Sequence, residues 1–217
     1  MSAKAFSYSE VASSLSATVV PLSSRVIVPR LSLGLFDELQ LYSSPPDCVS
    51  CGSGAVFAEA LGHCLDSSAI YSIGVQTDMA TPALDRYGSD KLKGEFLLPA
   101  IRGDYVGAIA VSEHTGGSDV ASLKSFARKD GDDYVINGQK MWITNATQAD
   151  FFCALINTSD GHPHKNKSLI IIPANTPGLK IGKKIAKLGL KSSDTAPIYF
   201  DDVRVPQEYR IGLEGEG

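Results

Sequence analysis

The sequence has no apolar run that approaches the length of a membrane-spanning helix. Such a helix needs about 20 mostly apolar residues, and charged residues, Gly or Pro interrupt every apolar stretch here. Blocks of like charge are also missing, since 20 Lys and Arg are set against 24 Asp and Glu, for a net charge of −4. A phosphate-binding tail is therefore excluded. We expect no membrane span and no nucleic-acid partner.

Cysteine is scarce, with four residues in 217. That number is too small for a disulfide framework and favours a reducing compartment. Cys48 and Cys51 form a C-x-x-C, which is typical of half a zinc site or of a redox pair. The neighbouring candidates, His63 and Cys64, are adjacent and poorly spaced for tetrahedral ligation. We expect no metal site, a loop around "SSPPDCVSCGSG", and a solvated loop at "DGHPHKNK".

The N-terminal segment differs in composition from the rest of the chain. Its first 36 residues are rich in Ser, carry Lys4, Arg25 and Arg30, and contain one acid, Glu10. This composition is typical of a mitochondrial transit segment, although Pro21 interrupts the amphipathic helix. The prediction is mitochondrial, with a cytoplasmic location as the alternative.

The whole chain is 43% hydrophobic, which is enough for a core. After the N-terminal segment, the sequence has two parts with different patterns. Residues 55–103 are helical in pattern, and "SDKLKGEFLLPAIRG" predicts a helix from a Ser89 cap to Gly103. From residue 104, short β-rich runs separated by turn residues predict strands, with Asn137-Gly138 as a hairpin signal. We predict an α+β fold: a segment 1–54, either disordered or targeting; a partial N-terminal helical domain 55–103; and an antiparallel β-sandwich or barrel 104–217.

Two stretches indicate a ligand site. In "EHTGGSDV", Gly116 and Gly117 permit backbone conformations closed to other residues, so that N–H groups can converge on an anion. In "QKMWITN", strand alternation places Trp142 and Thr144 on one face. Together they suit a ligand with a flat ring and phosphates. The alternatives are a Trp that belongs to the core and a plain Gly-rich turn.

The run "GAIAVSEHTGGSDVASLKSFARKDGDDYVINGQKMWITNATQADFF" resembles the middle β-domain of the acyl-CoA dehydrogenase family. That family has a T-E-P-G-A-G-S-D-like loop followed by N-G-x-K-x-W-I-T-N. The similarity continues through "TPGLKIGKKIAKLGLKSSDTAPIYFDDVRVP" and covers residues 55–217. His114 and Thr115 depart from it, since the family usually has Pro-Gly there.

The resemblance implies an FAD site and an acyl-CoA site. Ser112 would bond the polar edge of the flavin, Trp142 would pack on its ring, and Thr144 would lie near its reactive nitrogen. Ser118 would also contact the CoA part of the substrate. The implied cofactor-binding residues are Ile109, Ala110, Val111, Ser112, Gly117, Ser118, Trp142, Ile143 and Thr144.

The chemistry that the resemblance implies is α,β-dehydrogenation of an acyl-CoA thioester, with hydride transfer to FAD and reoxidation by an electron-transfer flavoprotein. The family's base is usually a glutamate of a C-terminal helical domain, which also builds the tetramer. We find no candidate base here, since Glu113 and Glu208 are expected to be structural or solvated. The expectation is a truncated, flavin-binding member that could still form a homo-oligomer. The alternatives are a non-catalytic flavin or acyl-CoA binding module that associates with full-length relatives, and oxidase chemistry on the same scaffold.

Overall fold

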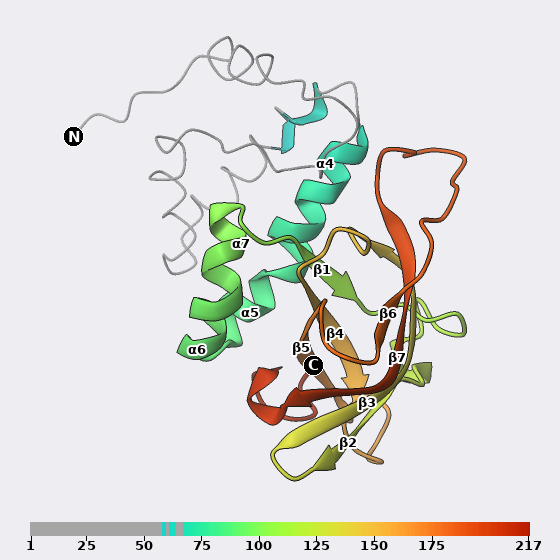
Figure 1. The fold of residues 1–217 in the computed structure, drawn as a ribbon. Coiled ribbons are helices and arrows are strands. Elements are labelled where there is room, and N and C mark those ends of the chain that lie inside the picture. Colours follow the sequence, from blue (N-terminus) through green and yellow to red (C-terminus); the bar gives the residue numbers. More distant parts are fainter. Residues whose placement is uncertain (1–57, 60, 64–66) are drawn as a thin grey trace, which may run out of the picture. The chain divides into compact units, whose positions relative to one another are not determined.

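The computed structural model describes residues 58–59, 61–63 and 67–217 (Figure 1). Cys48, Cys51 and the predicted segment 1–54 lie outside these residues. By its internal contacts the chain divides into two units, residues 1–70 and 71–217. The domain boundaries at residues 54 and 103 stay predictions. The second unit holds the sheet and nearly all of the described helices, and the site belongs to it.

Short helical segments precede the sheet. They are α4 (Ser67–Gly74), the π-helical η2 (Val75–Ala80), α5 (Pro82–Tyr87), α6 (Asp90–Leu92), the π-helical η3 (Lys93–Leu97) and α7 (Leu98–Arg102). The last three run on as one helix. The Ser89 hydroxyl accepts a hydrogen bond from the Leu92 N–H at 3.3 Å at its start, and Gly103 ends it in the left-handed conformation, with φ of 77°. Both predicted ends of this helix are confirmed: a serine caps its start and a glycine ends it, as the sequence indicated.

Eight strands form a mixed sheet. They are β1 (Gly107–Ala110), β2 (Phe126–Asp130), β3 (Asp133–Thr144), β4 (Phe151–Asn157), β5 (Lys167–Pro173), β6 (Leu179–Ile181), β7 (Thr195–Pro206) and β8 (Arg210–Ile211). The order is β6-β7-β3-β2-β4-β5-β8, with β1 paired to β4. The α+β class is confirmed. Most pairings are antiparallel as expected, but β4 pairs in parallel with β1 and, at one position, with β2.

The hairpin prediction at Asn137-Gly138 is wrong. The β2–β3 hairpin turns around Gly131 and Asp132, and Asn137 lies within β3, opposite Phe126. Gly138 has φ of 138°, and a Cβ there would lie 2.5 Å from the Ser125 hydroxyl oxygen. Glycine is needed here because two chain segments come close together, and not because the chain turns. The Asn-Gly pair alone does not distinguish these two cases.

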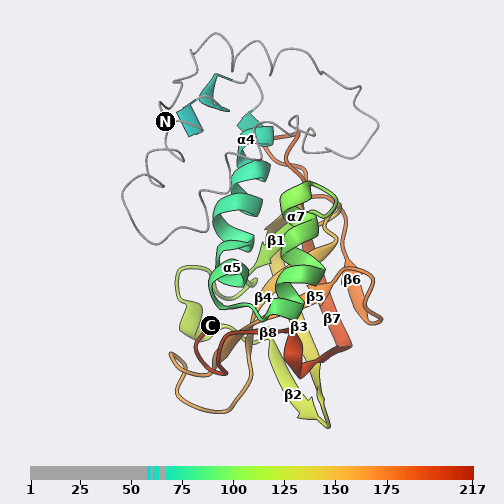
Figure 2. The ribbon, with the colours of Figure 1, turned by 90° about the vertical axis from the view of Figure 1, so that its left-hand side faces the viewer.

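Two apolar clusters hold this unit together. The first fills the space enclosed by the strands and includes Tyr134, Ile136, Phe152 and Ile198. In the second, the helix residues Leu84, Leu92, Phe96, Leu97 and Ala100 pack on Phe151, Cys153, Ile171 and Ile211. Figure 2 shows α5 and α7 in front of β4 and β5. Each buried Leu, Ile or Phe contributes about 1.5–3 kcal/mol, so the helices are fixed to the sheet face that they cover.

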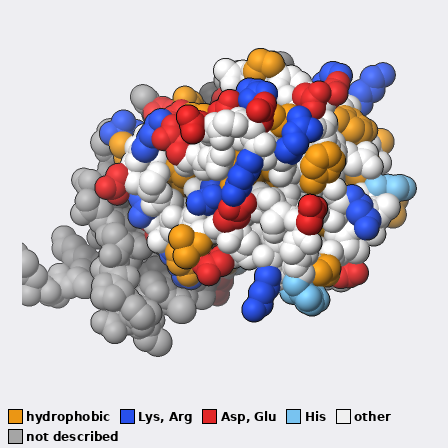
Figure 3. Space-filling view, turned by 90° about the horizontal axis from the view of Figure 1, so that it is seen from below, with side chains coloured by type: hydrophobic (Ala, Val, Ile, Leu, Met, Phe, Trp, Pro, Cys, Tyr) orange, Lys and Arg blue, Asp and Glu red, His pale blue; other side chains and the backbone are white. Residues whose placement is uncertain are grey.

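The surface carries both charge signs intermixed. Figure 3 shows Lys and Arg next to Asp and Glu over one face, and exposed ion pairs such as Lys129–Glu214 and Lys180–Asp201 join distant parts of the chain. Each such pair contributes at most about 1 kcal/mol. No helix in the described part of the chain is long and apolar enough to cross a membrane.

Candidate functional site

A cavity of about 170 Å³ lies where the second helical segment meets the ends of β1 and β3. Its lining combines aromatic and aliphatic side chains with three hydroxyls, those of Tyr71, Ser112 and Thr144. The lining residues are Tyr71, Val75, Met79, Ile109, Val111, Ser112, Trp142, Ile143 and Thr144. An apolar hollow with a few polar groups is the usual form of a small-molecule site.

The helical wall of the cavity follows from residue spacing. Tyr71, Val75 and Met79 recur at every fourth position and so share one helix face. The buried Gln76 fixes this helix to β1, since its amide donates to the Ala100 carbonyl at 3.1 Å and accepts from the Gly107 N–H at 3.2 Å. We did not predict these three wall residues, although their i, i+4, i+8 spacing was the available signal.

Trp142 occupies a bulge in β3. Lys140 is opposite Ile198 and Ile143 is opposite Ala196, so β3 carries one residue more than β7 between these pairs. Trp142 has φ of 59° and its side chain is 52% exposed. A left-handed conformation costs a non-glycine residue about 1–2 kcal/mol, and such strain concentrates at functional sites.

The bulge corrects the predicted strand alternation. We expected Ile143 to face away from Trp142 and Thr144, together with Met141. Instead all of Trp142, Ile143 and Thr144 border the cavity, and Ile143 also reaches the core. The extra residue turns the strand locally, so the flat indole and the Thr144 hydroxyl still lie at one hollow.

The aliphatic hydroxyls of Ser112 and Thr144 at the cavity make no hydrogen bond to the described residues. Ser112 is held by its backbone, since its carbonyl accepts from the Met141 N–H at 2.8 Å. Thr144 is 8% exposed. Both side chains are thus placed by the fold and have free donors and acceptors for a ligand.

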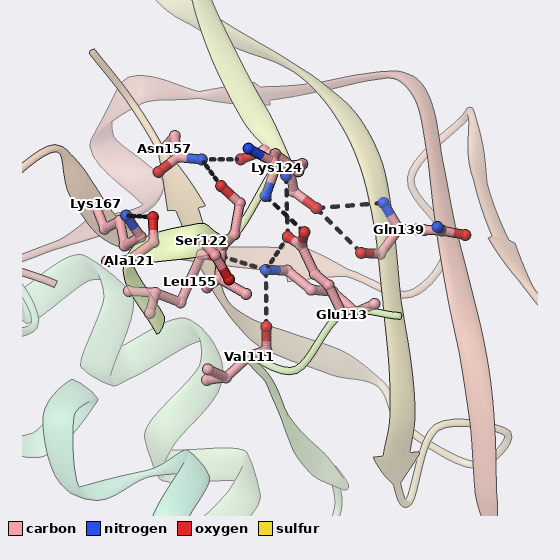
Figure 4. Close-up of polar contacts among 12 residues, drawn as sticks. Val111, Glu113, Ala121, Ser122, Lys124, Gln139, Leu155, Asn157 and Lys167 are labelled. Atoms are coloured by element: carbon pink, nitrogen blue, oxygen red, sulfur yellow. Dashed lines mark hydrogen bonds and ion pairs between the residues drawn. The ribbon is translucent and has the colours of Figure 1, made fainter. Parts of the chain in front are cut away.

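A buried ion pair lies behind the cavity wall. The Lys140 ammonium donates to Glu113 Oε1 at 2.9 Å, to the Val111 carbonyl at 3.0 Å and to the Leu155 carbonyl at 2.7 Å. Figure 4 shows the Glu113 carboxylate between Val111 and the backbone of Lys124. Burial lowers the pKa of Lys140, against the opposing effect of Glu113. Burial alone would raise the pKa of Glu113, but hydrogen bonds, first from the Lys124 N–H, outweigh it and the pKa lies below its ordinary value.

Six of the nine predicted residues line the cavity: Ile109, Val111, Ser112, Trp142, Ile143 and Thr144. The Ala110 side chain lies in the core instead, because it alternates with its two neighbours along β1. Gly117 and Ser118 lie in the exposed loop that follows and are not among the lining residues.

The Gly-rich loop differs from its prediction. Neither Gly116 nor Gly117 adopts a positive φ. A Cβ on Gly116 would lie 2.8 Å from the Ser122 hydroxyl oxygen, whereas one on Gly117 would meet no atom within 4 Å. The Gly116 N–H donates to the Glu113 carbonyl. Close packing therefore explains Gly116, and the structure gives no conformational reason for Gly117.

The metal prediction concerned Cys48, Cys51, His63 and Cys64, and separately the loop with His162 and His164. Of the first four, only His63 lies within the described residues. His162 and His164 lie in an exposed loop with their rings 5.4 Å apart. Among the described residues, no group of three or more His, Cys, Asp or Glu side chains could hold a metal ion.

The chain has clear relatives of known name. Residues 108–203 match the acyl-CoA dehydrogenase middle domain. Short-chain specific acyl-CoA dehydrogenase, mitochondrial, from Rattus norvegicus is 39% identical over 132 residues, which are 61% of this chain and 32% of that protein. The chain thus spans about a third of the length of this curated relative.

Solved structures agree. The acyl-CoA dehydrogenase from Geobacillus kaustophilus is 36% identical with a TM-score of 0.70, over 75% of this chain and 43% of that one. A structure described as PigA with FAD and proline is 34% identical with a TM-score of 0.73, over 75% of this chain and 43% of that one. The α+β fold, the motif order and these similarities lead to one conclusion: the chain belongs to the acyl-CoA dehydrogenase family.

Proposed function

We propose that the cavity binds the flavin of FAD and that this chain supplies the flavin-facing wall of an acyl-CoA dehydrogenase. The observation that carries the proposal is Trp142, turned outward in a left-handed conformation beside two hydroxyls that have no hydrogen bond in the described part of the chain. A flat ring system needs an aromatic surface, and its polar edge needs donors and acceptors. The residues present therefore fit this cofactor.

The proposed reaction is α,β-dehydrogenation of an acyl-CoA thioester, for which FAD, when bound, would supply the acceptor of the β-hydrogen as hydride. Trp142 packs on the ring, while Ser112 and Thr144 bond its polar edge and orient it. The apolar residues Ile109, Val111 and Val75 exclude water from this side. The Gly117-Ser118 loop, being exposed, is the proposed contact for the CoA part of the substrate.

The general base of this reaction is not among the residues that line the cavity, since none of them has a carboxylate or an imidazole. Glu113 is near, but its carboxylate is buried and used by Lys140 and by two backbone N–H groups. Its lowered pKa also makes it a poor proton acceptor. A residue outside the described lining supplies the base in this proposal.

The setting we propose is the mitochondrion, with fatty-acid oxidation as the process and an electron-transfer flavoprotein as the acceptor. Support comes from the Ser-rich, acid-poor N-terminal composition and from the mitochondrial name of the rat relative. Assembly with itself or with longer relatives would bring further residues to the cavity.

A second candidate is a non-catalytic module that binds flavin or acyl-CoA and regulates full-length relatives. The same absence of an acid or base from the described lining favours it. The two functions predict different behaviour after binding, since only the dehydrogenase reduces its flavin.

The test uses the full chain, purified, incubated with FAD and desalted. A flavin absorption spectrum that bleaches anaerobically on addition of butyryl-CoA supports the dehydrogenase. Peroxide formation in air would instead indicate oxidase chemistry. A bound flavin that never bleaches, with short, long or branched acyl-CoA, supports the binding module. A folded chain that retains no flavin refutes the dehydrogenase and the flavin-binding form of the module. Only a module that binds acyl-CoA alone would then remain, and it is refuted if the chain also binds no acyl-CoA.

A further inference from the structure

Lysine is an unusual residue to find fully buried within a strand, as Lys140 is in β3. Its side chain is fully buried, and that of Glu113 is 3% exposed. An ammonium group has three N–H donors and no acceptor, and all three are used here, by Glu113 and by the carbonyls of Val111 and Leu155. Burial of a lysine is unfavourable unless every donor is satisfied in this way. The arrangement therefore depends on these three acceptors staying in place.

Glu113 is satisfied as fully as its partner. Its Oε1 also accepts from the Ser125 N–H at 3.0 Å, and its Oε2 accepts from the Lys124 N–H at 2.6 Å. The backbone of Glu113 pairs with Gly116 in both directions. One carboxylate thus joins the start of the Gly-rich loop, the end of that loop and strand β3.

The pair lies at the point where the two walls of the cavity meet. Val111 and Ser112 precede Glu113 on one side, and the bulge with Trp142 follows Lys140 on the other. The Met141 N–H reaches the Ser112 carbonyl between them. A charge-assisted hydrogen bond is short and directional, so it fixes the separation of the two segments better than apolar packing would.

We propose that Lys140 and Glu113 are positioning residues, which set the distance between the Val111–Ser112 wall and the Trp142–Thr144 wall. Neither side chain lines the cavity. Their effect on ligand binding passes through the carbonyl of Val111, the backbone of Ser112 and the strained backbone of Trp142. The link to FAD rests on the proposed function, whereas the effect on Trp142 does not.

The chain offers a direct readout, because Trp142 is its only tryptophan. Three variants of the full chain are compared with wild type: K140M, E113Q and the double variant K140M/E113Q. The matched control is K180M, which removes the same side chain from an exposed ion pair with Asp201. Far-UV circular dichroism and a cooperative thermal transition identify the folded variants, and only these are used.

We expect K140M and E113Q to change acrylamide quenching of Trp142 by at least twofold and to weaken FAD binding at least tenfold. K180M should change neither. The double variant leaves no buried charge without a partner, so it folds even where K140M does not, and it should show the same change in quenching. Trp142 quenching as in wild type in folded E113Q and in the double variant would overturn the proposal, as would unchanged FAD affinity in both.

Failure of the proposed function looks different. Wild type that binds no FAD, together with altered quenching in the variants, would refute the flavin site and still support the positioning role.

Discussion

Replacement of Trp142 by Gly should destabilise the protein less than replacement by Ala. The indole is 52% exposed, so about half of its surface, roughly 100 Å², is lost from the interior in either variant. At about 25 cal/mol per Å² this loss costs about 2.5 kcal/mol. The backbone then separates the two variants, because Ala at φ of 59° keeps a left-handed penalty of about 1–2 kcal/mol and Gly does not.

Gly carries its own cost of about 0.5–1 kcal/mol, from the greater freedom of the unfolded chain. The difference leaves W142G more stable than W142A by about 0.5–1 kcal/mol. Urea unfolding followed by far-UV circular dichroism measures it, since both variants lack tryptophan fluorescence.

The control pair is R128A and R128G, at an exposed position of β2 where φ is not positive. There Ala should be the more stable, by about 0.5–1 kcal/mol. If W142A is as stable as W142G or more so, the backbone of Trp142 is not strained and the argument for an outward-turned indole fails. Both variants lack the indole and should therefore lose FAD retention, although they differ in stability. The effect of Trp142 on FAD binding is thus measured separately from its effect on stability.

Three further outcomes follow from the structure. Because hydrogen bonding holds the pKa of Glu113 below its ordinary value, its contribution to stability is present above about pH 4.3 and is lost as the pH falls toward the folded-state pKa. Glu113→Gln should therefore reduce the fall of Tm in acid. The control is Asp130→Asn, which should reduce it less, because the lowered pKa of Asp130 arises in an exposed ion pair. Burial raises the pKa of the Cys153 thiol to about 12, so peptide mapping should find it alkylated at neutral pH only after unfolding. Gly138→Ala should cost about 2–3 kcal/mol in urea unfolding, because its Cβ would meet Ser125.

Local signals predicted the parts of the fold that local interactions stabilise. Ser89 caps the helix and Gly103 ends it, and both depend on residues within one turn. The β-rich runs became strands because their apolar residues pack in the enclosed core. The order and direction of the strands did not follow, since parallel β1–β4 pairing joins segments about 40 residues apart in the chain.

The site was predicted through its residue types rather than its geometry. Ser112, Trp142 and Thr144 reach one cavity as the motifs indicated, but the reason differs. Glycines were expected to bend the loop by positive φ, whereas Gly116 serves close packing. Tyr71 and Val75 were not predicted to line the site, because their helical spacing is the same as that of any helix that covers a sheet.

Lys140 explains why strict alternation failed at the site. It lies opposite Ile198, and both are buried, so it points inward. Alternation would then place Trp142 inward as well, and the bulge moves Ile143 into that position instead. Lys140 is stabilised by Glu113, 27 residues away, and by Leu155, 15 residues away. A short window of sequence around Lys140 therefore does not contain the residues that allow its burial. In β3, a buried lysine two positions before a tryptophan goes together with a bulge, which keeps the charge satisfied and leaves the ring exposed.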